Sequence, residues 1–108
     1  MDNTDLENFK KDYDWNEAMR YAPFSMDDIV DVIAASEGMN EIEDWVAVVK
    51  LKEGFGYVEA GCDYTGWDCR AGGTGGSHDD LDHLVRFMLT SKSRRRLNMA
   101  LPDLDGTD

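Results

Sequence analysis

Two cysteines lie within one short and nearly symmetric stretch, AGCDYTGWDC, at residues 60–69. Cys62 and Cys69 could bind a metal, form a disulfide, act as a reactive dithiol or pack in the core. A reactive thiolate needs positive charge nearby, and the neighbouring side chains here include Asp63 and Asp68. Free cysteine behaves as a small buried hydrophobe, so we favour core packing for both thiols.

A zinc site is the first alternative. Cys62, Cys69, His78 and His83 form a C-x6-C-x8-H-x4-H pattern, and tetrahedral zinc takes four ligands of this kind. Structural zinc sites, however, usually place their cysteines roughly two to four residues apart. A cross-strand disulfide is sterically conceivable, although a reducing compartment disfavours it. We expect neither a metal nor any other cofactor.

Core packing does not require the aspartates and aromatic residues of this stretch. Like charges directly opposite each other destabilise a sheet. The two carboxylates could instead receive a lysine or arginine of a partner, or a hard cation, or they could bond backbone amides within a turn. If Thr65 and Gly66 form a two-residue turn, the facing pairs are Cys62 with Cys69, Asp63 with Asp68, and Tyr64 with Trp67.

Side-chain alternation divides the predicted sheet into two faces. The first is small and apolar, and it is expected to receive a helix: Val58, Ala60, Cys62, Cys69 and Ala71. The second is partly aromatic, and it is either an exposed interface or ordinary core under another helix: Trp45, Val49, Leu51, Phe55 and Tyr57.

Catalytic motifs are missing from the sequence. G-x-S-x-G, the phosphate-binding loop and H-E-x-x-H do not occur. The glycine-rich run at 72–76 precedes a predicted helix, but Asp79, Asp80 and Asp82 would repel an anion there. No serine or cysteine is obviously paired with a histidine as a nucleophile. We therefore predict that the protein is not an enzyme.

Acidic residues dominate the first part of the chain. The net charge is −12, and residues 1–44 carry 13 acidic and 3 basic side chains. Nucleic-acid-binding proteins concentrate positive charge instead, so we expect no direct binding of DNA or RNA. The natural complement is a protein with a basic surface, although the charge could equally serve solubility alone. The carboxylates expected to meet such a partner are Asp12, Asp14, Asp27, Asp28 and Asp31.

Two helices are predicted before the strands begin. Residues 4–21 show apolar steps of three and four residues, with a break near Asp14. The stretch 26–37 is predicted as a second helix, because Ser25 and Asp28 match a variant of the capping box.

Three strands are predicted next, at residues 45–51, 55–62 and 67–71, where β-branched and aromatic residues replace the helical period. The glycine-rich segment 72–77 is predicted as a flexible loop and residues 78–89 as an amphipathic helix. The order ααβββα predicts an α+β fold, in which a small three-stranded antiparallel meander packs against N-terminal and C-terminal helices.

The length of 108 residues suits a single domain. We divide it into an acidic helical extension at 1–24, a core at 25–98 and a loose tail at 99–108. No apolar run approaches the ~20 residues that span a membrane, and the acidic start does not resemble a secretory signal. We therefore expect a cytosolic protein that does not contact a membrane.

The run DWVAVVKLKEGFGYVEAGCDYTGWDCRAGG resembles a family of small, mostly uncharacterised proteins from bacteriophages of actinobacteria and other hosts. The likeness extends from about Ser25 to Leu97, including the LVRFMLT segment, and its distinctive part is the AGCDYTGWDC hairpin. It implies a phage gene product that acts in the host cytoplasm. It implies no activity, so no functional residue is carried over from the family.

Charge and resemblance together predict a non-catalytic phage accessory protein that docks on a host protein through an acidic surface. Such docking could inhibit a nucleic-acid-handling defence complex, such as a CRISPR effector, a restriction enzyme or a polymerase, by charge mimicry. The alternative is a zinc-stabilised or self-associating structural module, including a homodimer. The residues predicted to bind the partner are Asp12, Asp14, Asp27, Asp28 and Asp31, with Asp63, Tyr64, Trp67 and Asp68 as a hairpin anchor.

Overall fold

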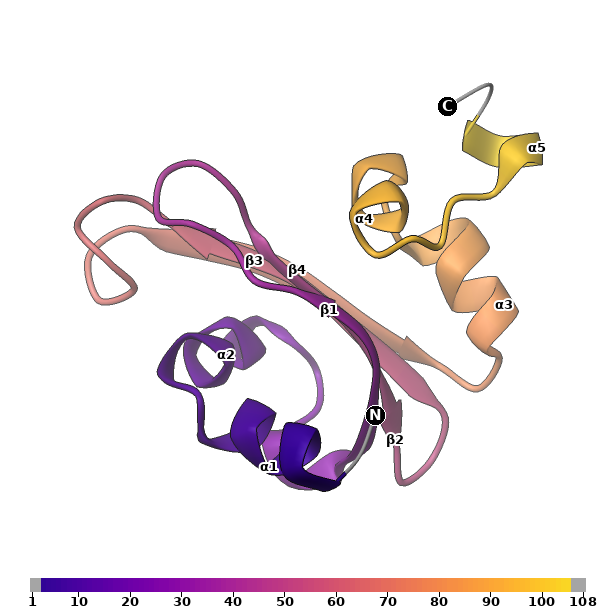
Figure 1. Cartoon of the computed structure of the whole chain (residues 1–108), viewed down its shortest axis with the longest axis horizontal. Coiled ribbons are helices and arrows are strands. Elements are labelled where there is room, and N and C mark those ends of the chain that lie inside the picture. The colour runs from indigo at the N-terminus through magenta and orange to yellow at the C-terminus, as the bar shows by residue number, and fades with distance from the viewer. Residues whose placement is uncertain (1–2, 106–108) are drawn as a thin grey trace.

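The structure is a computed structural model that describes residues 3–105. It has an α+β fold, in which a four-stranded antiparallel sheet of order β1-β2-β3-β4 lies between two groups of helices (Figure 1). The strands are β1 (Ile29–Ser36), β2 (Trp45–Leu51), β3 (Phe55–Cys62) and β4 (Ala71–His78).

Short helical segments flank the sheet in sequence. Those before it are α1 (Asn3–Lys11), α2 (Tyr13–Ala18) and the 3₁₀ turns η1 (Met19–Tyr21) and η2 (Met26–Asp28). Those after it are α3 (Leu81–His83), the π-helical η3 (Leu84–Met88), α4 (Ser91–Arg96) and α5 (Pro102–Asp105). No helix among the described residues is long and apolar enough to cross a bilayer.

Both faces of the sheet are buried, which explains why β2 is apolar along almost its whole length. On one face, alternate residues of β2 and β3 pack against α1, α2 and η1; the buried residues there include Trp45, Ala47, Val49, Val58, Ala60, Phe9, Trp15 and Met19. On the other face, the C-terminal helices supply the second core, with Val46, Val48, Tyr57, Leu84, Val85, Leu89 and Leu97.

Several predictions from the sequence are confirmed. The coarse α+β class is right, β2 and β3 have the predicted bounds, and the N-terminal helix breaks two residues before Asp14, near which a break was predicted. The break lies at Asp12, whose carboxylate caps α2 by accepting a hydrogen bond from Trp15 N at 3.0 Å.

The predicted helix at 26–37 is wrong: this segment forms η2 and then β1. The capping box is present, since Ser25 N donates to Asp28 at 3.0 Å, but it caps a single 3₁₀ turn. The register of β1 against β2 shifts twice, between Ile29 and Asp31 and between Val32 and Ala34. These irregularities place the two buried residues of β1, Ile29 and Val32, three positions apart, which imitates the helical period.

The predictions of a third strand at 67–71 and of a glycine-rich loop at 72–77 are both wrong. Residues 67–70 lie in a loop, whereas the glycine-rich segment 72–77 lies within β4. Glycine is needed at several positions of this strand because neighbouring atoms lie too close there for a side chain. A Cβ on Gly75 would lie 2.8 Å from the Cα of Ala22, and a Cβ on Gly76 would lie 2.7 Å from the Cε of Met88.

The predicted two-residue hairpin turn is also wrong. Cys62 pairs with Ala71, so the loop runs from residue 63 to residue 70. It contains two turns about Gly66, which has φ +91° and donates to Asp63 O at 3.0 Å. As a result Cys62 is buried and Cys69 is exposed, and the pairing of the two cysteines is lost.

The predicted division of the two faces is also wrong, because the pairing of β2 with β3 sets Trp45 opposite Ala60 and Ala47 opposite Val58. Trp45 and Val49 share a face with Val58 and Ala60 and lie under α1 and α2. Only Phe55 and Tyr57, of the five residues assigned to the aromatic face, lie under the C-terminal helices. The aromatic patch is therefore core on both sides of the sheet.

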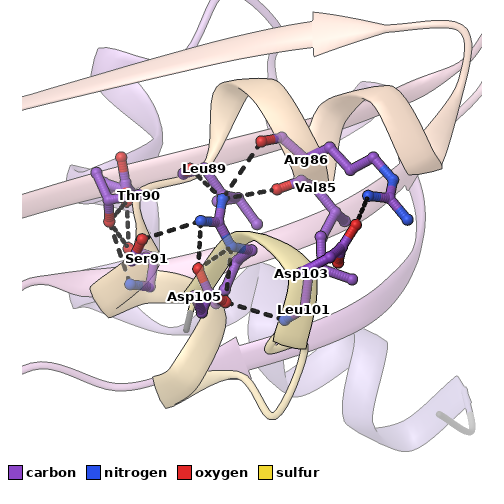
Figure 2. Close-up of polar contacts among 11 residues, drawn as sticks. Val85, Arg86, Leu89, Thr90, Ser91, Leu101, Asp103 and Asp105 are labelled. Carbon is purple, nitrogen blue, oxygen red and sulfur yellow. Dashed lines mark hydrogen bonds and ion pairs between the residues drawn. The ribbon is translucent and has the colours of Figure 1, made fainter. Parts of the chain in front are cut away.

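The C-terminal segments are joined by one guanidinium, that of Arg94. It donates to the carbonyls of Leu89 and Val85 at 2.8 and 3.1 Å and pairs with Asp105 of α5 at 2.5 Å (Figure 2). The tail predicted to be loose thus contains a short helix; residues 106–108 lie outside the described part of the chain, as do residues 1–2 of the N-terminal extension.

Candidate functional site

Asp14 and Trp67, predicted as separate partner-binding residues, lie in contact. The indole Nε1 of Trp67 donates a hydrogen bond to Asp14 Oδ1 at 2.9 Å. Trp67 is only 7% exposed, and its ring packs 5.2 Å from that of Trp45 at an interplanar angle of 59°. Trp67 is therefore the buried anchor that fastens the 63–70 loop to α2, and it does not offer its ring to a partner.

Asp63 organises the same loop. Its Oδ1 accepts hydrogen bonds from the backbone N of Thr65 at 2.8 Å and from the Thr65 hydroxyl. These bonds lower the pKa of Asp63. Asp63 therefore bonds a backbone amide within a turn, which is one of the two roles considered for it from the sequence. Tyr64 and Asp68 on the same loop are exposed.

The β1–β2 connection lies beside this loop, because Glu41 N donates to Cys62 O at 2.7 Å. A cavity of about 440 Å³ opens between the two segments. Arg70 is the single basic residue among those that line it. The lining residues are Glu41, Ile42, Glu43, Asp44, Gly61, Cys62, Asp63, Arg70, Ala71 and Gly72.

We call this region the acidic end of the sheet and define it by six carboxylates: Asp14, Glu41, Glu43, Asp44, Asp63 and Asp68. Four of them line the cavity. Arg96 partly neutralises Glu43, with 3.7 Å between the Arg96 guanidinium and the Glu43 carboxylate.

The charges of the other two carboxylates, Asp14 and Asp68, contribute to raised pKa values of neighbouring groups. Burial raises the pKa of the Cys62 thiol, and the charges of Asp14 and Asp63 raise it further. The pKa of Tyr13 is also raised; desolvation is the largest cause and the charge of Asp68 is the second. The raised pKa of the thiol disfavours a nucleophilic role for Cys62, because only the thiolate attacks.

Exposed apolar and aromatic side chains surround the acidic end. Tyr13 and Tyr64 are 62% and 75% exposed, and Met39 and Ile42 of the β1–β2 connection are 57% and 68% exposed. Carboxylates beside exposed aromatic and aliphatic groups are typical of a polar interface with an apolar centre.

The remaining predicted carboxylates lie elsewhere. Asp27 and Asp28 precede β1 at the opposite end of the sheet, where Ile29 pairs with Leu51. Asp28 serves the capping box, and Asp31 accepts a hydrogen bond from Val32 N at 2.9 Å. Among residues 3–105, none of the five predicted N-terminal aspartates forms an ion pair.

Sequence reasoning missed the contribution of residues 39–44. The acidic run EIED is visible in the sequence, but the helix predicted at 26–37 gives this run no fixed position relative to the 63–70 loop. Once residues 29–36 are a strand paired with β2, their connection must lie at the same end of the sheet as the 63–70 loop.

The four residues of the proposed zinc pattern are not gathered into a site. Cys69 is exposed, and the rings of His78 and His83 stack on each other with centroids 3.9 Å apart. In the part of the chain that the structure describes, no three His, Cys, Asp or Glu side chains come together as metal ligands would.

The fold and this site define an acidic α+β protein whose sheet is covered on both faces. Comparisons with protein-family models, with curated proteins and with solved structures find no match.

Proposed function

We propose that this is a non-catalytic binding protein, and that its acidic end receives a basic surface of a partner protein. One observation carries the proposal: four carboxylates from two separate segments of the chain, those of Glu41, Glu43, Asp44 and Asp63, line one cavity in which Arg70 is the single basic lining residue. Complementary charge of this kind speeds association and selects the partner.

The exposed side chains favour a protein as the ligand. Tyr13, Ile42 and Tyr64 offer apolar contact area next to the charges, and aromatic groups contribute much of the binding energy in protein interfaces. A nucleic acid would be repelled, since its affinity comes from the neutralisation of phosphates by basic groups.

The resemblance to small phage proteins supports a host protein as the partner, met in the host cytoplasm. Host complexes that handle nucleic acids have basic surfaces that bind phosphates. A protein with a gathered negative surface would compete with the nucleic acid for such a site. This mechanism would inhibit a CRISPR effector, a restriction enzyme or a polymerase.

The test is capture from a lysate of an actinobacterial host, followed by competition. Proteins retained on the immobilised chain are identified by mass spectrometry, and each purified candidate is then assayed for nucleic-acid binding with and without the chain. We expect a captured partner that is released as salt rises from about 0.1 to about 0.5 M and that loses nucleic-acid binding when the chain is added. Capture that is indifferent to salt would contradict the proposal.

A further inference from the structure

The two outer strands of the sheet differ in how their open edges are protected. Edge strands usually carry bulges, charges or proline, because an open edge can pair with another chain. β1 carries Asp31 and two register shifts. β4 pairs with β3 from Ala71 to His78 without a shift, and residues 71–77 contain no charge and no proline.

The exposed half of β4 lies near a buried carboxylate, that of Glu59 on β3. Glu59 is 9% exposed, and its Oε2 accepts hydrogen bonds from the Thr90 hydroxyl at 2.9 Å and from the Ser93 hydroxyl. No lysine or arginine of residues 3–105 forms an ion pair with it. The hydrogen bonds that Glu59 accepts from the described residues all end on Oε2, and Glu59 lines a cavity.

A second cavity of about 460 Å³ lies over Glu59 and borders β4. Its basic lining residues are Lys92 and Arg96. Arg96 is committed to other groups, because it donates to Asp44 O at 2.7 Å, to Ser36 Oγ at 3.0 Å and to Glu37 O. Lys92 is exposed and makes no ion pair with any described residue.

Small side chains separate the open edge from Glu59. Thr74 pairs with Glu59, and Gly72 pairs with Gly61, so Thr74 and Gly72 lie on the same face of the sheet as Glu59. A Cβ on Gly72 would meet nothing within 4 Å. A fifth strand beside β4 would lie about 10 Å from β3, at two strand spacings, a distance that the long side chains of lysine and arginine can cross.

We propose that an extended segment of the partner adds to the sheet as a fifth strand along β4, and that a lysine or arginine of this segment reaches Glu59. The inference rests on the proposed function and names how the partner is held. Gly72 and Asp44 line both cavities, so a strand at this edge also passes the acidic end. A second copy fits less well, since β4 has no lysine or arginine to offer and both chains carry −12.

The experiment uses a synthetic peptide of alternating lysine and threonine as the probe, titrated into the ¹⁵N-labelled protein. We expect amide shifts in residues 71–77 and around Glu59, and about tenfold weaker binding to Glu59→Gln. Glu53→Gln makes the same change of charge in the distant β2–β3 turn and should bind like the wild type. Thr74→Lys, which gives Glu59 an internal ammonium, should also weaken binding, and Lys92→Ala should strengthen it.

Three outcomes would overturn the strand-addition proposal. In the first, amide shifts are confined to residues 37–44 and 63–70, and Glu59→Gln and Glu53→Gln bind the peptide with equal affinity. The acidic end would then bind cations without any strand pairing at β4. In the second, a glutamine–threonine peptide binds as tightly as the lysine–threonine peptide, or neither binds at millimolar concentration. Either result would contradict the pairing of a lysine with Glu59. In the third, light scattering gives the mass of a dimer, and the amide shifts in residues 71–77 depend on protein concentration and not on the peptide. The edge of β4 would then pair with a second copy of the chain.

Discussion

The indole of Trp67 donates to the carboxylate of Asp14 at 2.9 Å and thereby joins two segments that are 53 residues apart in the chain. This bond fixes the 63–70 loop over α2, so that exposed Tyr13, Tyr64 and Asp68 belong to one surface. The acidic end depends on this junction for its shape.

Removal of the carboxylate should loosen the junction. We expect Asp14→Ala to lower the free energy of unfolding by about 2 kcal/mol, the usual worth of a hydrogen bond to a charged group, and to speed amide exchange in residues 63–70. Asp14→Asn keeps an acceptor and should cost less. Urea unfolding and hydrogen exchange measure both effects; equal stability of wild type and Asp14→Ala would show that the bond does not fasten the loop.

Two glycines of β4 should differ in their tolerance of alanine. A Cβ on Gly75 would lie 2.8 Å from Ala22 Cα and 2.9 Å from Tyr57 O, whereas one on Gly72 would lie in open space. We expect Gly75→Ala to destabilise by about 1–3 kcal/mol and Gly72→Ala to be neutral or to stabilise by up to about 1 kcal/mol. Denaturant unfolding compares the two, and a destabilised Gly72→Ala would contradict the open space above Gly72 on that face of the sheet.

The ion pair between Arg94 and Asp105 should make stability depend on pH. The two side chains are 6% and 1% exposed, and the hydrogen bond from Arg94 lowers the pKa of Asp105. A carboxyl whose pKa is lowered on folding stabilises the protein above its unfolded pKa of about 3.9 and loses that effect as pH falls through the folded value.

We therefore expect Asp105→Asn to lower the melting temperature near neutral pH. The gap between variant and wild type should narrow below about pH 4, as seen in melting curves across the acid range. A gap that stays constant with pH would mean that the charge of Asp105 is not what holds α5 in place.

The cysteines should react at very different rates. Cys69 is exposed, while Cys62 is buried and has a raised pKa, and only the thiolate attacks a disulfide reagent. Ellman's reagent should therefore release one thiol equivalent quickly and the second slowly, and Cys69→Ser should abolish the fast phase. Two equal rates would show that the region around Cys62 opens readily.

Sequence reasoning succeeded where local pattern and tertiary contact agree. β2 and β3 are apolar and β-branched, and their bounds were predicted correctly. β1 was missed because its bulges place Ile29 and Val32 at a helical spacing. β4 was missed because glycine is unfavourable in strands, and the close neighbours that require it, Ala22 and Met88, come from other elements.

The position of the candidate site residues was also predictable only where it did not depend on tertiary contacts. Asp14, Asp63 and Asp68 were chosen for their chemistry, and they do lie at one end of the sheet. Glu41 and Asp44 could not be placed beside them, because that proximity follows from β1 being a strand. Trp67 was predicted to bind the partner, but its indole has an internal acceptor that no local pattern indicates.

The most direct measurement compares two triple variants with the same change of charge in their affinity for the captured partner. Glu41→Gln/Asp63→Asn/Asp68→Asn neutralises the acidic end, and Asp27→Asn/Glu53→Gln/Asp79→Asn neutralises the opposite end of the sheet. We expect the first triple to bind about tenfold more weakly or worse at moderate salt and the second to bind like the wild type. Equal losses in the two triples, or no loss in the first, would contradict an acidic end that receives the partner.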